Sequence, residues 1–319
     1  MAMNEKSRLI IDTDPGQDDA AAILAAHGLA RRGLVDFLGM TVVAGNVGID
    51  LAAKNARIVC DWAGEKDFPV YAGAVKPLLR ELETAEAVHG KTGLDGTALH
   101  EPRCPLQKQH AVAYLVETLS RAEDASMTLC PIGPLTNIAL ALSIAPEAVR
   151  AIKRIVLMGG NYFEAGNMTP AAEFNFFTDP HAAQIVLQSG APITVLPLDV
   201  THKAQITSER MNRLRRLKNS NGSRLADILQ SYERFDIQQF GLEGGPLHDP
   251  CAVICAVFPE LFSGRMCRVD VETQSGLSTG ACAVDWHGTT GKAPNALWIT
   301  EVDADRMFEE LTAAIAELP

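Results

Sequence analysis

The apolar and polar positions of the chain alternate between short strand-like runs and longer stretches of helical period. Three apolar residues, Leu9–Ile11, lead toward a Pro15-Gly16 turn, which is typical of a strand end. An Ala-rich amphipathic helix is predicted at Ala20–Arg31, a buried strand at Val35–Ala44 and a second helix at Ile49–Ala63. This β-α-β-α order predicts a parallel sheet with right-handed crossovers.

The same rhythm continues along the chain. Further strand ends are predicted at Met127–Ile132, Ile155–Met158 and Ile193–Leu198. Amphipathic periodicity, or a proline at the favoured first position, predicts further helices at Gln109–Arg121, Leu135–Ala145, Pro180–Ser189, Glu209–Leu217, Arg224–Gln239 and Pro250–Phe258. After Phe262 the pattern changes to short β-like runs between Gly-rich turns, followed by a last helix that ends near Leu318. These runs are Cys267–Glu272, Ala281–Asp285 and Leu297–Val302.

No linker, repeat or low-complexity segment divides the sequence, and 319 residues are enough to bury a sizeable core. We therefore expect one domain over residues 1–319. Its fold class is α/β, with an open, mostly parallel, Rossmann-like sheet flanked by helices and a short antiparallel C-terminal extension.

Composition and charge narrow the function classes. The chain is 47% hydrophobic and 21% charged, which is ordinary for a soluble globular enzyme. Its net charge of −11 argues against non-specific binding to nucleic acid or to an anionic membrane. No apolar stretch approaches the ~18 residues of a membrane span, and no signal peptide is evident. The seven scattered cysteines lack a CxxC pair, which indicates the reduced thiols of a cytoplasmic protein.

The strongest chemical signal lies in the turn after the first strand. Asp12, Asp14, Asp18 and Asp19 place four carboxylates within eight positions. Such a concentration of negative charge is self-repulsive, and carboxylate oxygens select hard divalent cations such as Ca²⁺ or Mg²⁺. Helix capping would account for one or two of these acids but not for four. The turn therefore predicts a metal site with oxygen ligands at the edge where open parallel sheets bind ligands.

Other polar residues also follow predicted strand ends or stand in polar loops. They are Asn46, His89, Asn167, Glu173, Asn175, His248 and Asp249. Taken singly, each has an ordinary structural interpretation as a turn residue, an exposed loop residue or a helix cap. Because a parallel sheet brings its carboxyl ends to one edge, the joint pattern favours a single site.

The motifs that carry these residues resemble those of a known family, the inosine-uridine-preferring nucleoside hydrolases. The matching segments are DTDPGQDDAAAI (Asp12–Ile23), TVVAGN (Thr41–Asn46), HGKTGLDG (His89–Gly96), PIGPLTNIA (Pro131–Ala139), MGGN (Met158–Asn161), GNMTPAAEFNFFTDP (Gly166–Pro180) and LHDPCAV (Leu247–Val253). They stand in the family's order from Asp12 to the C-terminal region. The resemblance implies hydrolysis of the N-glycosidic bond of purine or pyrimidine ribonucleosides to ribose and free base, as in nucleoside salvage, with a tightly held Ca²⁺.

The resemblance also implies a role for each matching residue. Asp14 would be the general base toward a Ca²⁺-bound water, His248 would be the acid to the leaving base, and Asp12 would support the acidic turn. The calcium ligands would be Asp14, Asp19, Asp249 and the backbone carbonyl of Ile132. The residues around the substrate would be Asp18, Asn46, Asn167, Glu173 and Asn175 at the ribose and His89 beside the base. Members of the family are commonly homodimers or homotetramers.

These groups suit the reaction, because cleavage of a nucleoside builds positive charge on the ribose and negative charge on the departing base. Calcium acidifies water less than zinc does, so a carboxylate base is expected beside it. The base preference stays open. In the stretch Ser231–Gly241, Tyr232 could deliver a proton, whereas Phe235 and Phe240 can only shape the site or stack.

Two other functions stay open at this point. Asp12-Thr13-Asp14 imitates the Asp-x-Asp nucleophile motif of Mg²⁺-dependent phosphatases of the haloacid dehalogenase type, although the Pro15-Gly16 that follows is foreign to that motif. A nucleoside-binding protein without catalysis is the other alternative, against which the retention of Asp14 argues. Release of phosphate from nucleotides would support the first, and nucleoside binding without ribose release the second.

Overall fold

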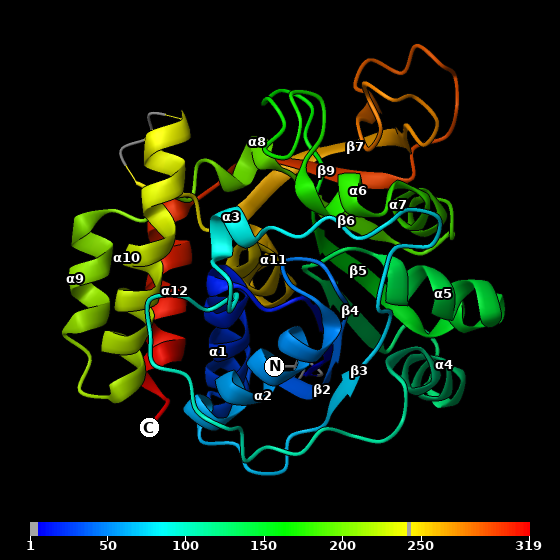
Figure 1. Cartoon of the computed structure of the whole chain (residues 1–319). Helices are drawn as coiled ribbons and strands as arrows, with labels where there is room; N and C mark the ends of the chain where they lie inside the picture. Colours follow the sequence, from blue (N-terminus) through cyan, green and yellow to red (C-terminus); the bar gives the residue numbers. More distant parts are fainter. Residues whose placement is uncertain (1–5, 241–243) are drawn as a thin grey trace, which may run out of the picture.

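A nine-stranded sheet forms the centre of the computed structural model, which describes residues 6–240 and 244–319 and, for residues 232–240, the helix but not the side chains (Figure 1). The strands are β1 (Ser7–Thr13), β2 (Val35–Val42), β3 (Val70–Ala72), β4 (Met127–Pro131), β5 (Ile152–Met158), β6 (Ile193–Leu196), β7 (Phe262–Val271), β8 (Cys282–Asp285) and β9 (Ala296–Val302). Their order across the sheet is β3-β2-β1-β4-β5-β6-β9-β7-β8. The first six follow the Rossmann order, whose switch point lies between β1 and β4.

The pairing along this sheet confirms the predicted fold class. Every neighbouring pair from β3 to β9 is parallel, while β7 runs antiparallel to both β9 and β8. The antiparallel part is thus confined to β7 and its two partners, and β9 itself extends the parallel sheet beside β6. The fold is a single α/β domain with a short antiparallel C-terminal part.

Helices cover both faces of the sheet, and each face has its own apolar core (Figure 1). On β1, Leu9 and Ile11 belong to one core and Ile10 to the other, as expected for a central strand that is buried on both sides. The face with Leu9 is covered by α1 (Gln17–Arg31), α2 (Ile49–Ala63) and α11 (His248–Val257). Outside them, α10 (Ser220–Phe240) and α12 (Ala304–Ala316) pack against α1, and α9 (Ser208–Arg215) packs against α10 and α12. The other face is covered by α4 (Ala111–Arg121), α5 (Thr136–Ile144) and α7 (Pro180–Leu187).

Besides the 3-10 helices at Pro146–Ala151 and Pro259–Leu261, four short elements of the described residues were not predicted from the sequence. They are β3 and the helices α3 (Glu86–His89), α6 (Phe174–Thr178) and α8 (Leu198–Thr201). Each is only three to five residues long, too short to show a hydrophobic period. One consequence concerns the site, because Asn175 lies within α6 and not in a loop, and His89 is the last residue of α3.

Four helices begin earlier than predicted, namely α1, α9, α10 and α11, and the shifts of α1 and α11 move acidic residues into a first helical turn. Helix α1 starts at Gln17, so Asp18 and Asp19 belong to it. Helix α11 starts at His248, so the prediction of Pro250 as its first residue is wrong. Proline fits there nevertheless, because the first four N–H groups of a helix have no partner within it.

Among the helices of the described part of the chain, none combines the length and the apolar character that crossing a bilayer requires. All seven cysteines are free thiols, and six of them are buried. Cys251 and Cys255 lie on a buried face of α11, as their spacing predicted.

Candidate active site

The acidic turn connects β1 to α1 at the switch point of the sheet. Gly16 is the N-cap of α1, and its N–H donates to the Asp19 carboxylate at 2.9 Å. The hydroxyl of Thr13 donates to the other oxygen of Asp19. Capping therefore accounts for part of the bonding of Asp19, and this carboxylate also reaches the neighbouring acids.

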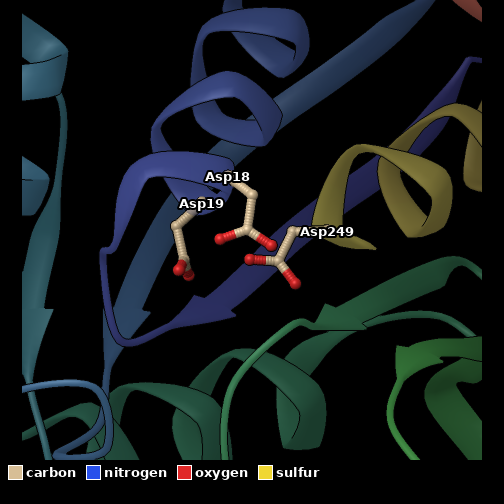
Figure 2. A group of neighbouring side chains, drawn as sticks. All are labelled: Asp18, Asp19 and Asp249. Carbon is tan, nitrogen blue, oxygen red and sulfur yellow. The ribbon is translucent and has the colours of Figure 1, made fainter. Parts of the chain in front are cut away.

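Three carboxylates converge at this point, from the start of α1 and the start of α11 (Figure 2). One oxygen from each of Asp18, Asp19 and Asp249 lies within 4.8 Å of the others, and all three side chains are buried. Burial raises the pKa of both Asp19 and Asp249, and repulsion from neighbouring carboxylates raises that of Asp249 further. A cation among these oxygens would offset the repulsion and the loss of hydration.

Asp14 lies deeper, with a side chain 1% exposed. Its Oδ2 accepts the N–H of Asn46 at 2.7 Å, whereas its Oδ1 is buried with no hydrogen-bond partner among the described residues. Burial, followed by the charge of Asp19, raises the pKa of Asp14 well above its ordinary value. Buried carboxylate oxygens are normally paired, so an orphaned one beside three clustered acids fits a hard cation.

Two glycines enclose the carboxylate of Asp14. A Cβ built on Gly45, which follows β2, would lie 2.1 Å from Asp14 Oδ2. A Cβ built on Gly133, which follows β4, would lie 2.3 Å from Asp14 Oδ1. Both distances are far below van der Waals contact, so only glycine fits beside this side chain at either position.

The predicted carbonyl ligand, Ile132, follows β4 directly. Its carbonyl oxygen accepts the side-chain amide of Asn175 at 3.0 Å, and the same amide donates to Met158 at the end of β5. Asn46, after β2, donates its amide to the backbone oxygen of Asp14 and to the Asp19 carboxylate, both at 3.2 Å. These two amides hold the edges of the site together, and both also border its cavity.

A cavity of about 340 Å³ opens above the acid cluster. Its walls bring together most of the predicted site residues from distant parts of the chain. They are Asp18, Asn46, His89, Ile132, Asn167, Glu173, Asn175, His248 and Asp249. The volume lies within the range typical of pockets for small ligands.

Glu173 and Asn167 are organised by backbone N–H groups. The Glu173 carboxylate accepts the N–H groups of Gly160, Asn175 and Phe176 at 2.8–3.1 Å and caps α6, and burial raises its pKa. The Asn167 side-chain oxygen accepts the N–H of Phe174 at 2.9 Å. The interpretation of Glu173 as an exposed loop residue is therefore wrong, because its side chain is buried and caps α6. Both Glu173 and Asn167 support the backbone here and also lie in the cavity wall.

Two histidines border the same cavity. His248 is buried, and its Nδ1 lies 2.7 Å from the hydroxyl of Thr201 in α8. Burial lowers the pKa of His248 well below its ordinary value, and the nearby His202 and His89 lower it further. Burial also lowers the pKa of His89, to about 4. Both rings are therefore neutral at pH 7.

Asp12 lies beneath the cavity and does not border it. Its Oδ1 accepts the hydroxyl of Thr41 at 2.6 Å and the amide of Asn137 at 2.8 Å, while its Oδ2 has no partner among the described residues. Burial raises the pKa of Asp12 to about 7.

Residues that support the loop after β5 without bordering the cavity were not predicted from the sequence. The carboxylate of Asp199, at the start of α8, accepts three consecutive N–H groups, those of Tyr162, Phe163 and Glu164, each at 3.0 Å. Its other oxygen accepts the indole N–H of Trp298 at 2.7 Å. No spacing signal in the sequence links these positions. The aromatic side chains of Tyr232, Phe235 and Phe240, singled out from the sequence, lie outside the described residues.

An acid cluster, amides and two histidines thus surround one cavity at the switch point of a Rossmann-like sheet. This arrangement is typical of α/β enzymes whose active site contains a cluster of carboxylates suited to a metal ion.

More particularly, the chain belongs to the inosine-uridine preferring nucleoside hydrolase family, whose model matches residues 9–309. It is 44% identical over 309 residues to the pyrimidine-specific ribonucleoside hydrolase RihA of Shewanella sp. (strain MR-7), covering 97% of this chain and 96% of that one. It is also 44% identical over 312 residues to the uncharacterized protein C1683.06c of Schizosaccharomyces pombe, covering 98% and 100%. The solved purine-preferring ribonucleoside hydrolase from Gardnerella vaginalis superposes with a TM-score of 0.89 at 30% identity, covering 97% and 98%.

The resemblance drawn from the motifs is thereby confirmed, and with it the class of reaction. The chain is an N-glycosyl hydrolase whose substrates are small ribonucleosides. Neither the phosphatase nor the non-catalytic binding protein is favoured by these relatives.

Proposed function

We propose that this chain hydrolyses ribonucleosides with one Ca²⁺ held by Asp14, Asp19, Asp249 and the backbone carbonyl of Ile132. The observation that carries the proposal is the unpartnered, buried Oδ1 of Asp14 beside the converging acids, directly under a cavity of nucleoside size. Carboxylate and carbonyl oxygens are the ligands that calcium takes. When bound, the ion supplies positive charge and orients oxygen ligands.

The remaining steps fall to Asp14, beneath the cavity, and to side chains of the cavity wall. Asp14 takes a proton from the attacking water as general base. Asp18, Asn46, Asn167, Glu173 and Asn175 hold the ribose hydroxyls, and such positioning lowers barriers by roughly 7–11 kcal/mol in favourable cases.

His248 acts as the acid to the departing base, which is commonly worth about 10²–10⁴-fold. The resting ring is neutral, so its proton must lie on the nitrogen that faces the base. The hydroxyl of Thr201, 2.7 Å from Nδ1, supports this assignment, since it can donate to Nδ1 and leave the proton on Nε2. His89 flanks the base, and Asp12 supports the turn.

Pyrimidine ribonucleosides are the proposed preferred substrates. The relatives at 44% identity include enzymes named pyrimidine-specific, whereas the solved neighbour named purine-preferring is 30% identical. We further propose that residues 1–319 form one domain, that the protein is cytoplasmic, and that it assembles as a homodimer or homotetramer, as members of the family commonly do.

The decisive experiment measures free ribose from uridine, cytidine, inosine and guanosine with the calcium-loaded protein. The proposal predicts ribose from all active substrates and the highest kcat/KM with a pyrimidine. Asp14→Asn should abolish turnover and weaken calcium binding, while His248→Ala should cut turnover with calcium still bound. Asp124→Asn, at an exposed carboxylate far from the cavity, is the matched control and should change neither. Wild-type turnover in Asp14→Asn would refute the assignment of the base.

A further inference from the structure

Residues 73–85 connect β3 to α3 and reach the cavity after passing α6 and α7 (Figure 1). The end of this connection and α3 itself, Thr84–His89, are here called the α3 segment. The α3 segment contributes to the cavity wall through Thr84, Ala85, Ala87, Val88 and His89. Where this part of the wall lies therefore depends on how the connection before it is held.

The first anchor of the connection is the carboxylate of Asp179, which is buried at the start of α7. Its Oδ1 accepts the N–H of Ala182 at 3.0 Å and caps that helix, and its Oδ2 accepts the hydroxyl of Thr136 in α5 at 2.7 Å. The same Oδ2 accepts the N–H of Leu78 at 2.9 Å. Replacing Asp179 would also uncap α7 and disturb α5, so this anchor cannot be tested separately from the fold.

The second anchor is Arg80, which binds α6. Its guanidinium donates to the backbone oxygen of Phe177, and its Cζ lies 4.1 Å from the centroid of the Phe177 ring. A planar guanidinium can donate at its edge while it rests on an aromatic face, whereas an ammonium is a compact point charge. The Arg80 side chain is 26% exposed, and its Nη2 lies 3.2 Å from the Glu83 carboxylate. The double contact with Phe177 therefore depends on arginine at this position.

Helix α6 itself carries two residues of the cavity wall, Phe174 and Asn175. Arg80 thus links two elements that border the same cavity, the α3 segment and α6. The contacts of Arg80 that the structure describes are to Phe177 and Glu83, and neither is among the described residues of the cavity wall. Its effect on a bound molecule must therefore pass through the position of the wall.

We propose that Arg80 is a positioning residue, which clamps the α3 segment to α6 and holds the cavity at the width that binds a nucleoside. The inference rests on the proposed function of the cavity and adds a residue outside its wall. A nucleoside binds fully only to molecules whose wall is in place, so the apparent affinity falls with the fraction of molecules in that arrangement. Because Arg80 acts on the wall and not on the acid cluster, its loss raises KM and leaves kcat nearly unchanged.

The clamp is tested by hydrogen exchange with mass spectrometry on the calcium-loaded protein, in peptides that cover the α3 segment. The amides of Val88 and His89, which donate to one backbone oxygen at 2.9 and 3.0 Å, report on this segment. In Arg80→Met they should exchange about 10-fold faster, the factor that corresponds to about 1.4 kcal/mol of lost bonding. Arg80→Lys keeps the charge and should fall between the two. Unchanged exchange in Arg80→Met, or exchange that is equally faster in α11, would overturn the proposal, since the latter reports a general loss of stability.

The consequence for the substrate is tested by ribose release from uridine. Arg80→Met should raise KM about 10-fold with kcat within about twofold of the wild type, and Arg80→Lys should recover part of this loss. Arg121→Met, at an exposed arginine of α4, is the matched control and should change neither KM nor the exchange of the α3 segment. An unchanged KM in Arg80→Met, or a fall in kcat at unchanged KM, would overturn the proposal. If the wild type released no ribose from any nucleoside, the proposed function would fail, and the exchange rates would still decide the clamp.

Discussion

Asp199 should stabilise the protein through four accepted hydrogen bonds, and mutation can isolate the contribution of the one that comes from the indole of Trp298. In Asp199→Asn, the amide oxygen can still accept the three N–H groups of Tyr162, Phe163 and Glu164. Its NH₂ group then faces the indole N–H of Trp298, which donates to the carboxylate at 2.7 Å in the native protein. Two donors would oppose each other in a site where both residues are buried.

The magnitude follows from the bonds that change. A hydrogen bond to a charged group contributes about 1.5–3 kcal/mol, and a buried donor left unsatisfied costs about 1–3 kcal/mol. We therefore expect Asp199→Asn to lower the free energy of unfolding by about 2–4 kcal/mol. Asp199→Ala should cost more, because it removes the acceptor from all four donors.

The assay is urea unfolding followed by circular dichroism, in a double-mutant cycle with Trp298→Phe. Phenylalanine removes the indole N–H, so it relieves the opposed donors that Asp199→Asn creates. The loss of unfolding free energy in the double variant should be about 1–2 kcal/mol smaller than the sum of the losses in the two single variants, a coupling typical of residues in contact. Asp199→Asn should also raise KM for nucleosides, because the same loop carries Asn161, whose side-chain oxygen accepts the N–H of Glu173. Additive losses, or a loss below about 0.5 kcal/mol in Asp199→Asn, would refute this reasoning.

Three further predictions concern pH, packing and metal. Burial between Phe37 and Phe68 lowers the pKa of His27 to about 3 in the folded protein. Because the pKa in the unfolded chain is about 6.5, the free energy of unfolding falls as the pH drops through 6.5. Between pH 8 and pH 5, urea unfolding should show a loss about 2 kcal/mol larger in the wild type than in His27→Phe. Gly133→Ala should weaken calcium binding and turnover, measured by calorimetry and ribose release, because its Cβ would displace the Asp14 carboxylate. Chelation of divalent ions should lower the urea midpoint more at pH 7 than at pH 5. Asp14, Asp19 and Asp249 have raised pKa values, so protons increasingly replace the cation as pH falls. An equal effect at both pH values would contradict this.

The sequence predicted what depends on local pattern. The run Leu9–Ile11 and the Ala-rich stretch after Asp19 placed β1, α1 and the acidic turn correctly, because a buried strand and an amphipathic helix have distinct hydrophobic periods. The same reasoning could not find α3 or α6, which are single turns fixed by tertiary contacts.

The candidate site was predicted partly from residue type and partly from the family resemblance. The chemistry of the acids pointed to a metal site without any alignment of structures. The acid cluster nevertheless differs in membership from the predicted ligand set, since Asp18 lies among its oxygens and Asp14 lies deeper. Side-chain supports such as Arg80 and Asp199 escaped notice, because their partners are distant in sequence and their roles follow only from three-dimensional contacts.

The slot between Gly45 and Gly133 has a consequence for how quickly and how tightly the site can take up its ion. A carboxylate confined on both sides has almost no rotational freedom left before any ligand arrives, so capture of the ion requires little ordering of this side chain. Strands β2 and β4 reach the slot from opposite sides of β1, which ties the aperture to the spacing of the sheet itself. Affinity for the ion is therefore coupled to the pairing of β1 with β2 and β4. A substitution that weakens this pairing should lower the affinity for the ion before it affects the rest of the fold.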